Sequence, residues 1–314
     1  MRGGKQNVTQ SVVAPLYLSD VSPRDYKWDL HQVNAHEVAA YYKNSDFTEY
    51  HKRLNVCGVS LIFRVVIDEL RLNAANFCRV RYCPICQWRR SLKWKAKAYQ
   101  VIPRIIEQFP SCRWIFLTLT VRNCDISQLL PTVSWMHHGF SNLTKRKAWA
   151  PEGWIRSTEV TRSATGQAHP HVHCLLMVSP DYFEDKAQYL HQSQWAAEWA
   201  SVLGLDYLPV VDVRAIPRGI SPAVVVPEIF KYQTKAGHLL ADRDWLLELT
   251  TQMKGIRMIA PGGVLRRHLR ELRDEQADLL LINDDEESAE FTNDCPEVPF
   301  MWNPWEKRYE AWVD

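Results

Sequence analysis

Apolar runs of strand length alternate with longer amphipathic segments through the middle of the chain. Residues 114–121 (WIFLTLTV) are apolar and β-branched, which is typical of a buried strand. Residues 154–161 alternate between polar and apolar side chains, and after turn residues at 164–167 an apolar run follows at 171–178. These two segments predict an antiparallel hairpin. A further strand is predicted over 207–216.

Segments with a helical period lie between and after these strands. Residues 87–109 predict a basic amphipathic helix that is kinked or ended near Pro103. A helix beginning near Pro227 carries the residues EIFKYQTKAG, with proline in its first turn and Gly237 as its stop. Residues 1–50 have only weak periodicity, and we expect them to be irregular. The other predicted helices cover 125–148, 182–203, 243–254 and 264–281.

The order strand, helix, hairpin, helix, strand, helix predicts an α+β fold. We expect a central antiparallel sheet with flanking helices, placed on one face of the sheet. No internal repeat and no long Gly/Ser- or Pro-rich linker divides the chain. The expected regions are an N-terminal extension, a cysteine-rich segment with its basic helix, a sheet core, a helical segment and an acidic tail. In that order they cover 1–54, 55–110, 111–240, 241–282 and 283–314.

The composition is that of an ordinary globular protein, with 314 residues of which 46% are apolar and 24% charged. It excludes collagen-like, coiled-coil and wholly disordered classes. No window approaches the ~20 apolar residues of a membrane helix, and the first residues lack the apolar core of a signal peptide. We therefore expect a cytoplasmic protein without a membrane partner.

The net charge of +2 conceals two segments of opposite sign. Residues 71–113 contain ten Lys or Arg against the single Glu107, a local net charge of +9. Residues 283–314 contain ten Asp or Glu against two basic residues, a local net charge of −8. The basic segment indicates a polyanionic partner such as nucleic acid, and the acidic one an interaction tail. A solvated helix face and a solubilising tail are the plainer alternative.

Four of the eight cysteines lie close together along the chain: Cys57, Cys78, Cys83 and Cys86. A Cys-x-x-Cys knuckle with two more thiolates from another segment is a common tetrahedral Zn²⁺ site. A cytoplasmic location argues against disulfides, and a redox Cys-x-x-Cys pair needs no third or fourth thiol. Buried thiols acting as small apolar groups account for the other four cysteines. We predict structural zinc at the cluster.

Basic residues interleaved with Trp88, Trp94 and Tyr99 surround and follow the knuckle. Cations between aromatic rings suit phosphate contact and base stacking. The predicted DNA-binding residues of this stretch are Arg79, Arg81, Arg89, Arg90, Lys93 and Lys95.

Three histidines lie within five residues at the start of the second hairpin strand. Residues two apart share one face of a strand, so the rings of His171 and His173 point the same way. The hairpin register places Glu159 opposite one of them. Two imidazoles and a carboxylate form a three-ligand metal site with open positions, whereas core histidines satisfied by backbone carbonyls are the alternative. His169 could add a ligand, but it ranks below the other two histidines because we expect Pro170 to break the alternation.

Glu228, Tyr232 and Lys235 fall at positions i, i+4 and i+7 of the helix predicted from Pro227. One face of that helix would carry a carboxylate, a phenol and an ammonium group. A phenol with a pKa of ~10 is a poor nucleophile unless a metal and a cation help to form the phenolate. The spacing alone is common on exposed helix faces, so this hypothesis depends on the other motifs.

Together these elements, in this order, resemble the replication initiators of small rolling-circle plasmids, in the His-hydrophobe-His (HUH) endonuclease superfamily. The resemblance rests on the apolar strand at 116–120, the two-histidine strand and the helix with Tyr232, and it includes the cysteine segment of one branch of these initiators. It spans about residues 55–240. It implies that the core at 111–240 is an HUH nuclease domain of the RRM or ferredoxin-like kind.

The resemblance implies that Tyr232 attacks a phosphodiester at the plasmid origin, presented as a single strand or a hairpin. The tyrosine would become linked to the 5′ phosphate and leave a free 3′-OH as a primer, which brings in a host polymerase and a host helicase as partners. Members of this branch with a single tyrosine carry a glutamate four residues upstream, which activates water for the terminating cut. Glu228 matches that position.

The resemblance further implies that His171 and His173, with Glu159 as third ligand, hold Mg²⁺ or Mn²⁺ beside the phosphate. Lys235 and Lys231 would lie near the same phosphate.

Two alternatives stay open from the sequence. A relaxase or single-strand transposase of the same superfamily would share the cleavage chemistry and differ in its DNA substrate. A non-catalytic zinc-dependent DNA-binding regulator would explain the basic cysteine segment, but it would leave His171, His173 and Tyr232 without a role.

Overall fold

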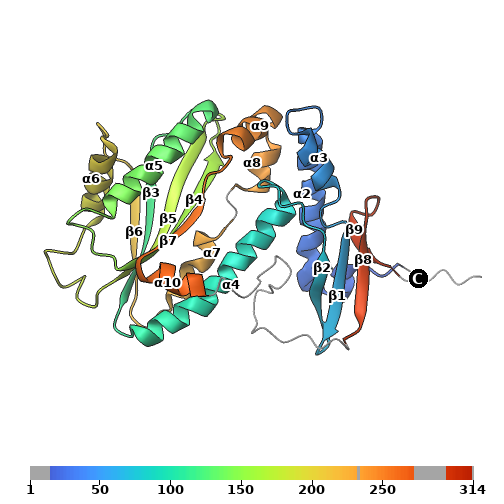
Figure 1. Cartoon of the computed structure of the whole chain (residues 1–314), viewed down its shortest axis with the longest axis horizontal. Helices are drawn as coiled ribbons and strands as arrows, with labels where there is room; N and C mark the ends of the chain where they lie inside the picture. Colours follow the sequence, from blue (N-terminus) through green and yellow to red (C-terminus); the bar gives the residue numbers. More distant parts are fainter. Residues whose placement is uncertain (1–14, 232–233, 272–294, 313–314) are drawn as a thin grey trace, which may run out of the picture.

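The computed structural model describes residues 15–231, 234–271 and 295–312, which form two antiparallel sheets connected by helices (Figure 1). One sheet has the strand order β6-β3-β5-β4-β7 and the other the order β2-β1-β8-β9. The predicted α+β class with antiparallel sheets and flanking helices is confirmed. The strands are β1 (Ser60–Val66), β2 (Glu69–Ala75), β3 (Arg113–Thr120), β4 (Gly153–Arg162), β5 (Ala168–Val178), β6 (Val211–Ile216), β7 (Ile259–Gly262), β8 (Glu297–Asn303) and β9 (Arg308–Ala311).

The longest helix, α4, runs between the two sheets (Figure 1). The α-helices are α1 (Leu18–Val21), α2 (Tyr26–Tyr42), α3 (Thr48–Asn55), α4 (Pro84–Gln108), α5 (Leu129–Leu143), α6 (Gln192–Leu203), α7 (Val226–Ile229), α8 (Ala236–Leu240), α9 (Arg243–Gln252) and α10 (Gly263–Glu271). None of the described helices combines the length and the apolar character that crossing a membrane requires.

The predicted hairpin is the pair β4 and β5 at the centre of the five-stranded sheet, and its register is as expected, with Glu159 opposite His171. The strand predicted at 114–121 is β3, which pairs with β5 on the side away from β4. The strand predicted over 207–216 is shorter, since β6 begins at Val211.

Helices cover both faces of the five-stranded sheet, so the prediction that they lie on one face is wrong. Helices α5 and α6 pack against one face, on side chains such as Leu117 and Cys174. Helices α4, α7 and α10 pack against the other, on side chains such as Phe116 and Leu175. Both faces of β3 and β5 are therefore buried, which explains why these strands are continuously apolar rather than alternating.

Three helices lie wholly or partly in the segment that was expected to be irregular: α1, α2 and the start of α3. The buried side of α2 has the spacing of a helix face but includes two polar residues, His31 and Gln32, among apolar ones such as Trp28 and Ala35. A periodicity measured on apolar residues alone is weakened by such a face. The part of the predicted extension at 1–14 lies outside the described residues.

The acidic segment predicted as a tail contributes two strands of the four-stranded sheet, β8 and β9. β8 pairs with β1, with Phe300 opposite Leu61, and Phe300 is fully buried. The Tyr309 hydroxyl lies 2.6 Å from the carbonyl oxygen of Gly58 and 2.9 Å from Oε1 of Gln32. The described part of this segment is thus a hairpin anchored by the buried Phe300, Trp302 and Tyr309, and the most acidic stretch, 283–294, lies outside the described residues.

Several helix boundaries differ from the prediction. α4 continues through Pro103, which is exposed, so water can satisfy the carbonyl that the proline leaves without an N–H partner. The helix predicted over 182–203 begins only at Gln192. The helix predicted over 264–281 is α10 as far as Glu271, and 272–281 lie outside the described residues.

Replacing Tyr309 with Phe should lower the free energy of unfolding by about 1–3 kcal/mol, because a buried acceptor next to it loses its donor. Urea denaturation followed by circular dichroism measures the change. Tyr26→Phe is the matched control, since the Tyr26 side chain is exposed. Equal unfolding free energies for the two variants would contradict this role of Tyr309.

Candidate active site

Three side chains from β4 and β5 converge on one face of the five-stranded sheet. Nε2 of His171 lies 2.8 Å and Nε2 of His173 lies 3.2 Å from the same carboxylate oxygen, Oε2 of Glu159. All three residues are at least nine-tenths buried. The antiparallel register produces this geometry, since Glu159 pairs directly with His171, while His173 lies two residues further along the same face. The structure thus brings together the three residues that were predicted as metal ligands.

The outer nitrogen of each ring also has a partner, which fixes the orientation of the ring. Nδ1 of His173 lies 3.1 Å from Oγ1 of Thr118, and Nδ1 of His171 lies 3.3 Å from the carbonyl oxygen of His169. A carbonyl only accepts, so Nδ1 of His171 carries a proton, and in the neutral ring Nε2 then holds a lone pair. That lone pair faces the Glu159 carboxylate. Such a contact is stable only with a proton or a cation between the two atoms.

Lys231 brings a positive charge to the same carboxylate, with Nζ 2.7 Å from Oε2 of Glu159. Burial would raise the pKa of Glu159, but the contacts of its carboxylate with the two imidazoles and with the Lys231 ammonium outweigh burial and hold that pKa below its ordinary value. Burial also lowers the pKa of His173, which favours the neutral ring that binds metals. The cluster is therefore an ionised carboxylate between imidazoles, with donor atoms that suit a divalent cation.

The predicted continuous helix from Pro227 to Gly237 is wrong for the described residues. α7 ends at Ile229, and α8 begins only at Ala236. The Phe230 carbonyl accepts a hydrogen bond from the Ser91 hydroxyl of α4. The Phe230 ring stacks on Trp94, with centroids 5.7 Å apart. These contacts from α4, together with the Lys231 ion pair, hold Phe230 and Lys231 in a non-helical conformation.

The break removes the expected helical alignment of Glu228 with Lys235, at i and i+7. Glu228 lies in α7, whereas Lys235 is the exposed residue that precedes α8. Tyr232, the predicted nucleophile, lies outside the described residues.

Glu228 is connected to the histidines through Arg214, a residue that the sequence analysis missed. The Arg214 guanidinium lies 3.2 Å from Glu228 and packs 4.8 Å from the centroid of the Phe116 ring. The Phe116 ring in turn stacks on His173 at 5.7 Å. Arg214 pairs with Phe116 across β6 and β3, so only the strand order reveals its place beside the site. The alternation of charged residues in β6 is the one sequence signal for it.

His169 lies next to the site, but it is not one of the three clustered ligands. Its ring centroid is 5.3 Å from that of His171. The expectation that Pro170 breaks the alternation is wrong, because β5 begins at Ala168 and pairs with β4 through Pro170 without a register shift. The N–H and C=O of Ala168 both bond to Cys124. The backbone nitrogen of Pro170, two residues later, therefore points to the same side of β5, towards the end of β3. The β3 register ends at His171, so Pro170 removes no ladder bond.

The four clustered cysteines meet at the junction of α3, β2 and α4, and all four are buried. The Sγ atom of Cys86 lies 3.7 Å from that of Cys57 and 3.6 Å from that of Cys78, and Cys83 lies 3.6 Å from Cys57. Four sulfurs at ~2.3 Å from one tetrahedral zinc ion lie roughly 3.8 Å apart. The spacing is too long for disulfides and is that of a zinc site.

The backbone around the cluster is arranged to support thiolates. The N–H groups of Cys78 and Arg79 each point to a cysteine sulfur at 3.3 Å, and Arg79 takes the unusual φ of 58° that directs its N–H inwards. Gly58 also has a positive φ, and a Cβ there would lie 2.9 Å from Ile85. Arg90 donates to three carbonyls of the loop between Cys78 and Cys83.

The predicted DNA-binding residues fall into different environments. Arg79 is exposed, and Arg81, Arg90, Lys93 and Lys95 are half-buried. The interpretation of Arg89 as a DNA contact is wrong in this fold, because it is buried, with its guanidinium over the rings of Trp28 and Trp88. Trp88 is likewise a buried core residue, packed against Trp28, rather than a stacking surface for bases.

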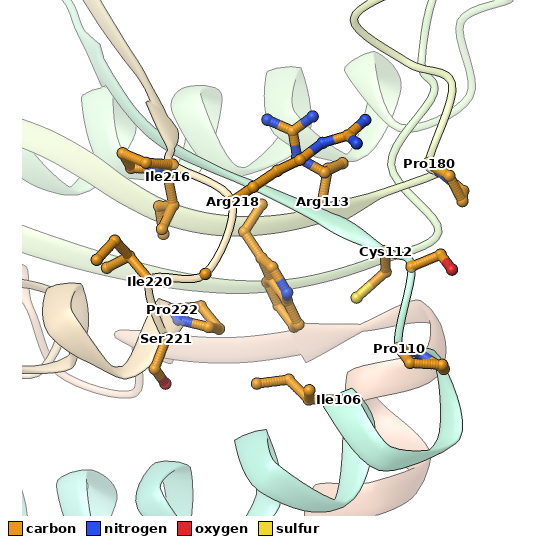
Figure 2. Close-up of a pocket in the computed structure, with 14 residues that line it drawn as sticks. Ile106, Pro110, Cys112, Arg113, Pro180, Ile216, Arg218, Ile220, Ser221 and Pro222 are labelled. Carbon is orange, nitrogen blue, oxygen red and sulfur yellow. The ribbon is translucent and has the colours of Figure 1, made fainter.

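A cavity of about 630 Å³ lies at the other end of the five-stranded sheet (Figure 2). Its lining combines apolar side chains such as Ile106 and Ile216 with Arg113 and Arg218. β3 starts at this cavity and reaches Thr118, beside the histidines, five residues later, about 16 Å along the strand. The lining includes none of the predicted site residues, so this cavity is separate from the candidate site at the histidines.

Comparison with known proteins places the chain among plasmid replication proteins. The profile of a family described as "Replication protein" matches residues 69–310. The chain is 33% identical over 311 residues to the "Protein rep" of Lentilactobacillus hilgardii, covering 94% of this chain and 98% of the relative. It is 32% identical over 302 residues to the "Protein rep" of Lactiplantibacillus plantarum, covering 91% and 95%. No solved structure matches the chain.

Proposed function

The chain belongs to the replication-protein family as a plasmid rolling-circle replication initiator, and from that premise we propose that it cuts one strand of the plasmid origin with Tyr232 as nucleophile. The observation that carries the proposal is the buried group formed by Glu159, His171 and His173, with Lys231 bonded to the same carboxylate. Tyr232 is the next residue in the sequence after Lys231. A metal-binding group and a cation are thereby joined to the segment that carries the phenol.

The cut would be a transesterification. The Tyr232 oxygen forms a bond to the phosphorus, the bond from phosphorus to the 3′ oxygen breaks, and the phenolic proton is replaced by one on the released 3′-OH. The energy of the phosphodiester is kept in the tyrosine ester. The free 3′-OH then serves as a primer for a host polymerase, and a host helicase would open the duplex ahead of it.

The residues around Glu159 fit Mg²⁺ or Mn²⁺. A divalent ion would satisfy both the carboxylate and the lone pair of His171 that faces it, and the three donor atoms lie within 4.8 Å of one another. When bound, the ion would polarise the scissile phosphate as a Lewis acid. The part of Thr118 is to hold the His173 ring in place. Lys231, once displaced from Glu159, would place its ammonium near the phosphate, and the exposed Lys235 would add a second positive charge there.

Glu228 would act in the terminating cut by activating water, so that no second tyrosine is needed. Its carboxylate is half-buried and is held by Arg214, whose guanidinium packs on Phe116 beside His173. Arg214 is then a positioning residue, which keeps the carboxylate on the catalytic face of the sheet.

We also propose that the cysteine cluster holds one structural Zn²⁺. Its sulfur spacing and its inward N–H groups support a closed four-thiolate site. The zinc would fix the start of α4, whose Ser91 and Trp94 in turn hold Phe230 and the segment before Tyr232.

Replacing both Cys83 and Cys86 with Ser should reduce bound zinc from one ion per chain to near zero, because two of four ligands are lost. Mass spectrometry of the native protein measures the zinc. Cys112→Ser, at a half-buried cysteine outside the cluster, should retain it. Zinc-free wild-type protein that cuts origin DNA at full rate would refute the structural role.

The double replacement of His171 and His173 with Ala should weaken Mn²⁺ binding at least about a hundredfold, since even partners of metal ligands contribute 10–100-fold in affinity. Titration calorimetry measures the binding. His137→Ala is the matched control, because His137 is a largely buried histidine bonded to Thr158 and not to the cluster. Zinc content should stay at one ion in both variants. If the double variant bound Mn²⁺ as tightly as the wild-type protein, the ion would not bind at these histidines.

Tyr232→Phe should abolish the denaturant-resistant adduct that forms when the protein is incubated with a single-stranded origin oligonucleotide and Mn²⁺. The phenyl ring has no oxygen to attack the phosphate. Glu228→Ala should keep that first adduct but fail at termination, which leaves multimeric plasmid products. An adduct in Tyr232→Phe would reassign the nucleophile, and clean monomer circles from Glu228→Ala would reassign the terminating base.

A further inference from the structure

Three adjoining hollows connect the candidate active site to the C-terminal helix α10. One of about 420 Å³ lies between the loop after Cys78 and β7, and one of about 350 Å³ lies between α4 and α10. A gap of about 30 Å³ leads from them to Lys231. Trp94 lines all three, and Arg257 and Pro261 line the two large ones. We name this continuous depression the α4–α10 groove.

The α4–α10 groove is strongly positive. Its lining residues, all of them in the described part of the chain, include eight Lys or Arg and no Asp or Glu. Three of the cations come from the C-terminal part of the chain, to which the sequence analysis assigned no DNA contact: Arg257, Arg266 and Arg270, all exposed. A concave surface with one sign of charge concentrates a polyanion.

The strand pairing places one end of the groove beside the carboxylate. Ile259 of β7 pairs with Ser157, two residues before Glu159 on β4, and the Met258 carbonyl accepts the N–H of Thr158. At this end Lys231 lines the gap and also bonds Glu159. A chain lying in the groove would therefore run directly to the site of cutting.

The shape favours a single strand over a duplex. Proteins read duplex DNA with a helix or ribbon that projects into a groove of the DNA, whereas this surface is itself hollow. Single-strand sites combine a positive channel with aromatic rings. Trp94, half-buried and stacked on Phe230, lies where the three hollows meet.

Given the strand cleavage proposed above, on which this inference rests, we propose that the α4–α10 groove holds single-stranded origin DNA next to the scissile phosphate. Arg257, Arg266 and Arg270 would contact successive phosphates, and Trp94 would offer a ring to a base near the cut. The C-terminal part of the core is then part of the DNA-binding surface and not only a support for the sheet.

The test removes the three arginines together, as Arg257→Ala/Arg266→Ala/Arg270→Ala, in full-length protein carrying Tyr232→Phe so that no adduct forms. Fluorescence anisotropy follows the binding of a single-stranded origin oligonucleotide at several salt concentrations. Each lost phosphate contact reduces the slope of log K against log salt by about 0.7 for single strands, so the slope should fall by about 2. Arg146→Ala, at an exposed arginine of the opposite, α5 side, should leave the slope unchanged.

Further measurements test the DNA-binding role of the groove separately from the proposed strand cleavage. If the triple variant has the circular dichroism spectrum of the native protein and its salt slope is unchanged, the proposed role of the groove is wrong. A loss of affinity for duplex DNA only would also contradict it. In the wild-type chain, the same oligonucleotide should slow hydrogen exchange of β7 and α10 amides, and exchange that is unaffected would also overturn the groove. Adduct formation by the wild-type chain is measured separately. If no adduct forms, the proposed strand cleavage is rejected, and the salt slope still tests whether the groove binds single-stranded DNA.

Discussion

The pairing of Glu159 with His171 across β4 and β5 is the constraint on which the rest of the site depends. Because side chains alternate along a strand, a slip of one residue would turn the carboxylate to the opposite face, towards α5 and α6. The register is held on both sides of β5, by β4 and by β3, and on both faces of the sheet by apolar side chains. The paired strands therefore hold the carboxylate and both imidazoles in fixed positions inside the sheet core.

A buried carboxylate needs compensating charge, and this requirement shapes the chain beyond the sheet. Lys231 supplies it in this structure, and the segment from Ile229 to Lys231 leaves its helix to reach Glu159. Ser91 and Trp94 of α4 hold the same segment from the other side. The helix that the local sequence favours is thus interrupted after Ile229, because the Lys231–Glu159 ion pair and the stacking of Phe230 on Trp94 are more stabilising.

Helix α4 connects the cysteine cluster to the face of the five-stranded sheet that carries Glu159 and the two histidines. Cys83 immediately precedes it, its first turn carries Cys86, its middle carries Trp94, and its later turns pack on the five-stranded sheet. The cluster also fixes the loop before β1, where Gly58 receives the Tyr309 hydroxyl of the C-terminal hairpin. The C-terminal hairpin is therefore attached next to the cysteines. The α4–α10 groove then lies between an element fixed by the cluster and an edge strand fixed by β4.

The sequence by itself determined the central hairpin, its register and the cysteine cluster, because strand alternation and ligand spacing are local properties. It did not reveal α2, whose buried face includes His31 and Gln32, nor the break after Ile229, where contacts from distant residues outweigh helix propensity. Arg214 gains its place only through the strand order, and the C-terminal arginines gain theirs only because β7 adds to the edge of β4. Tertiary structure decided these features since each depends on which distant segments become neighbours, and local pattern does not contain that information.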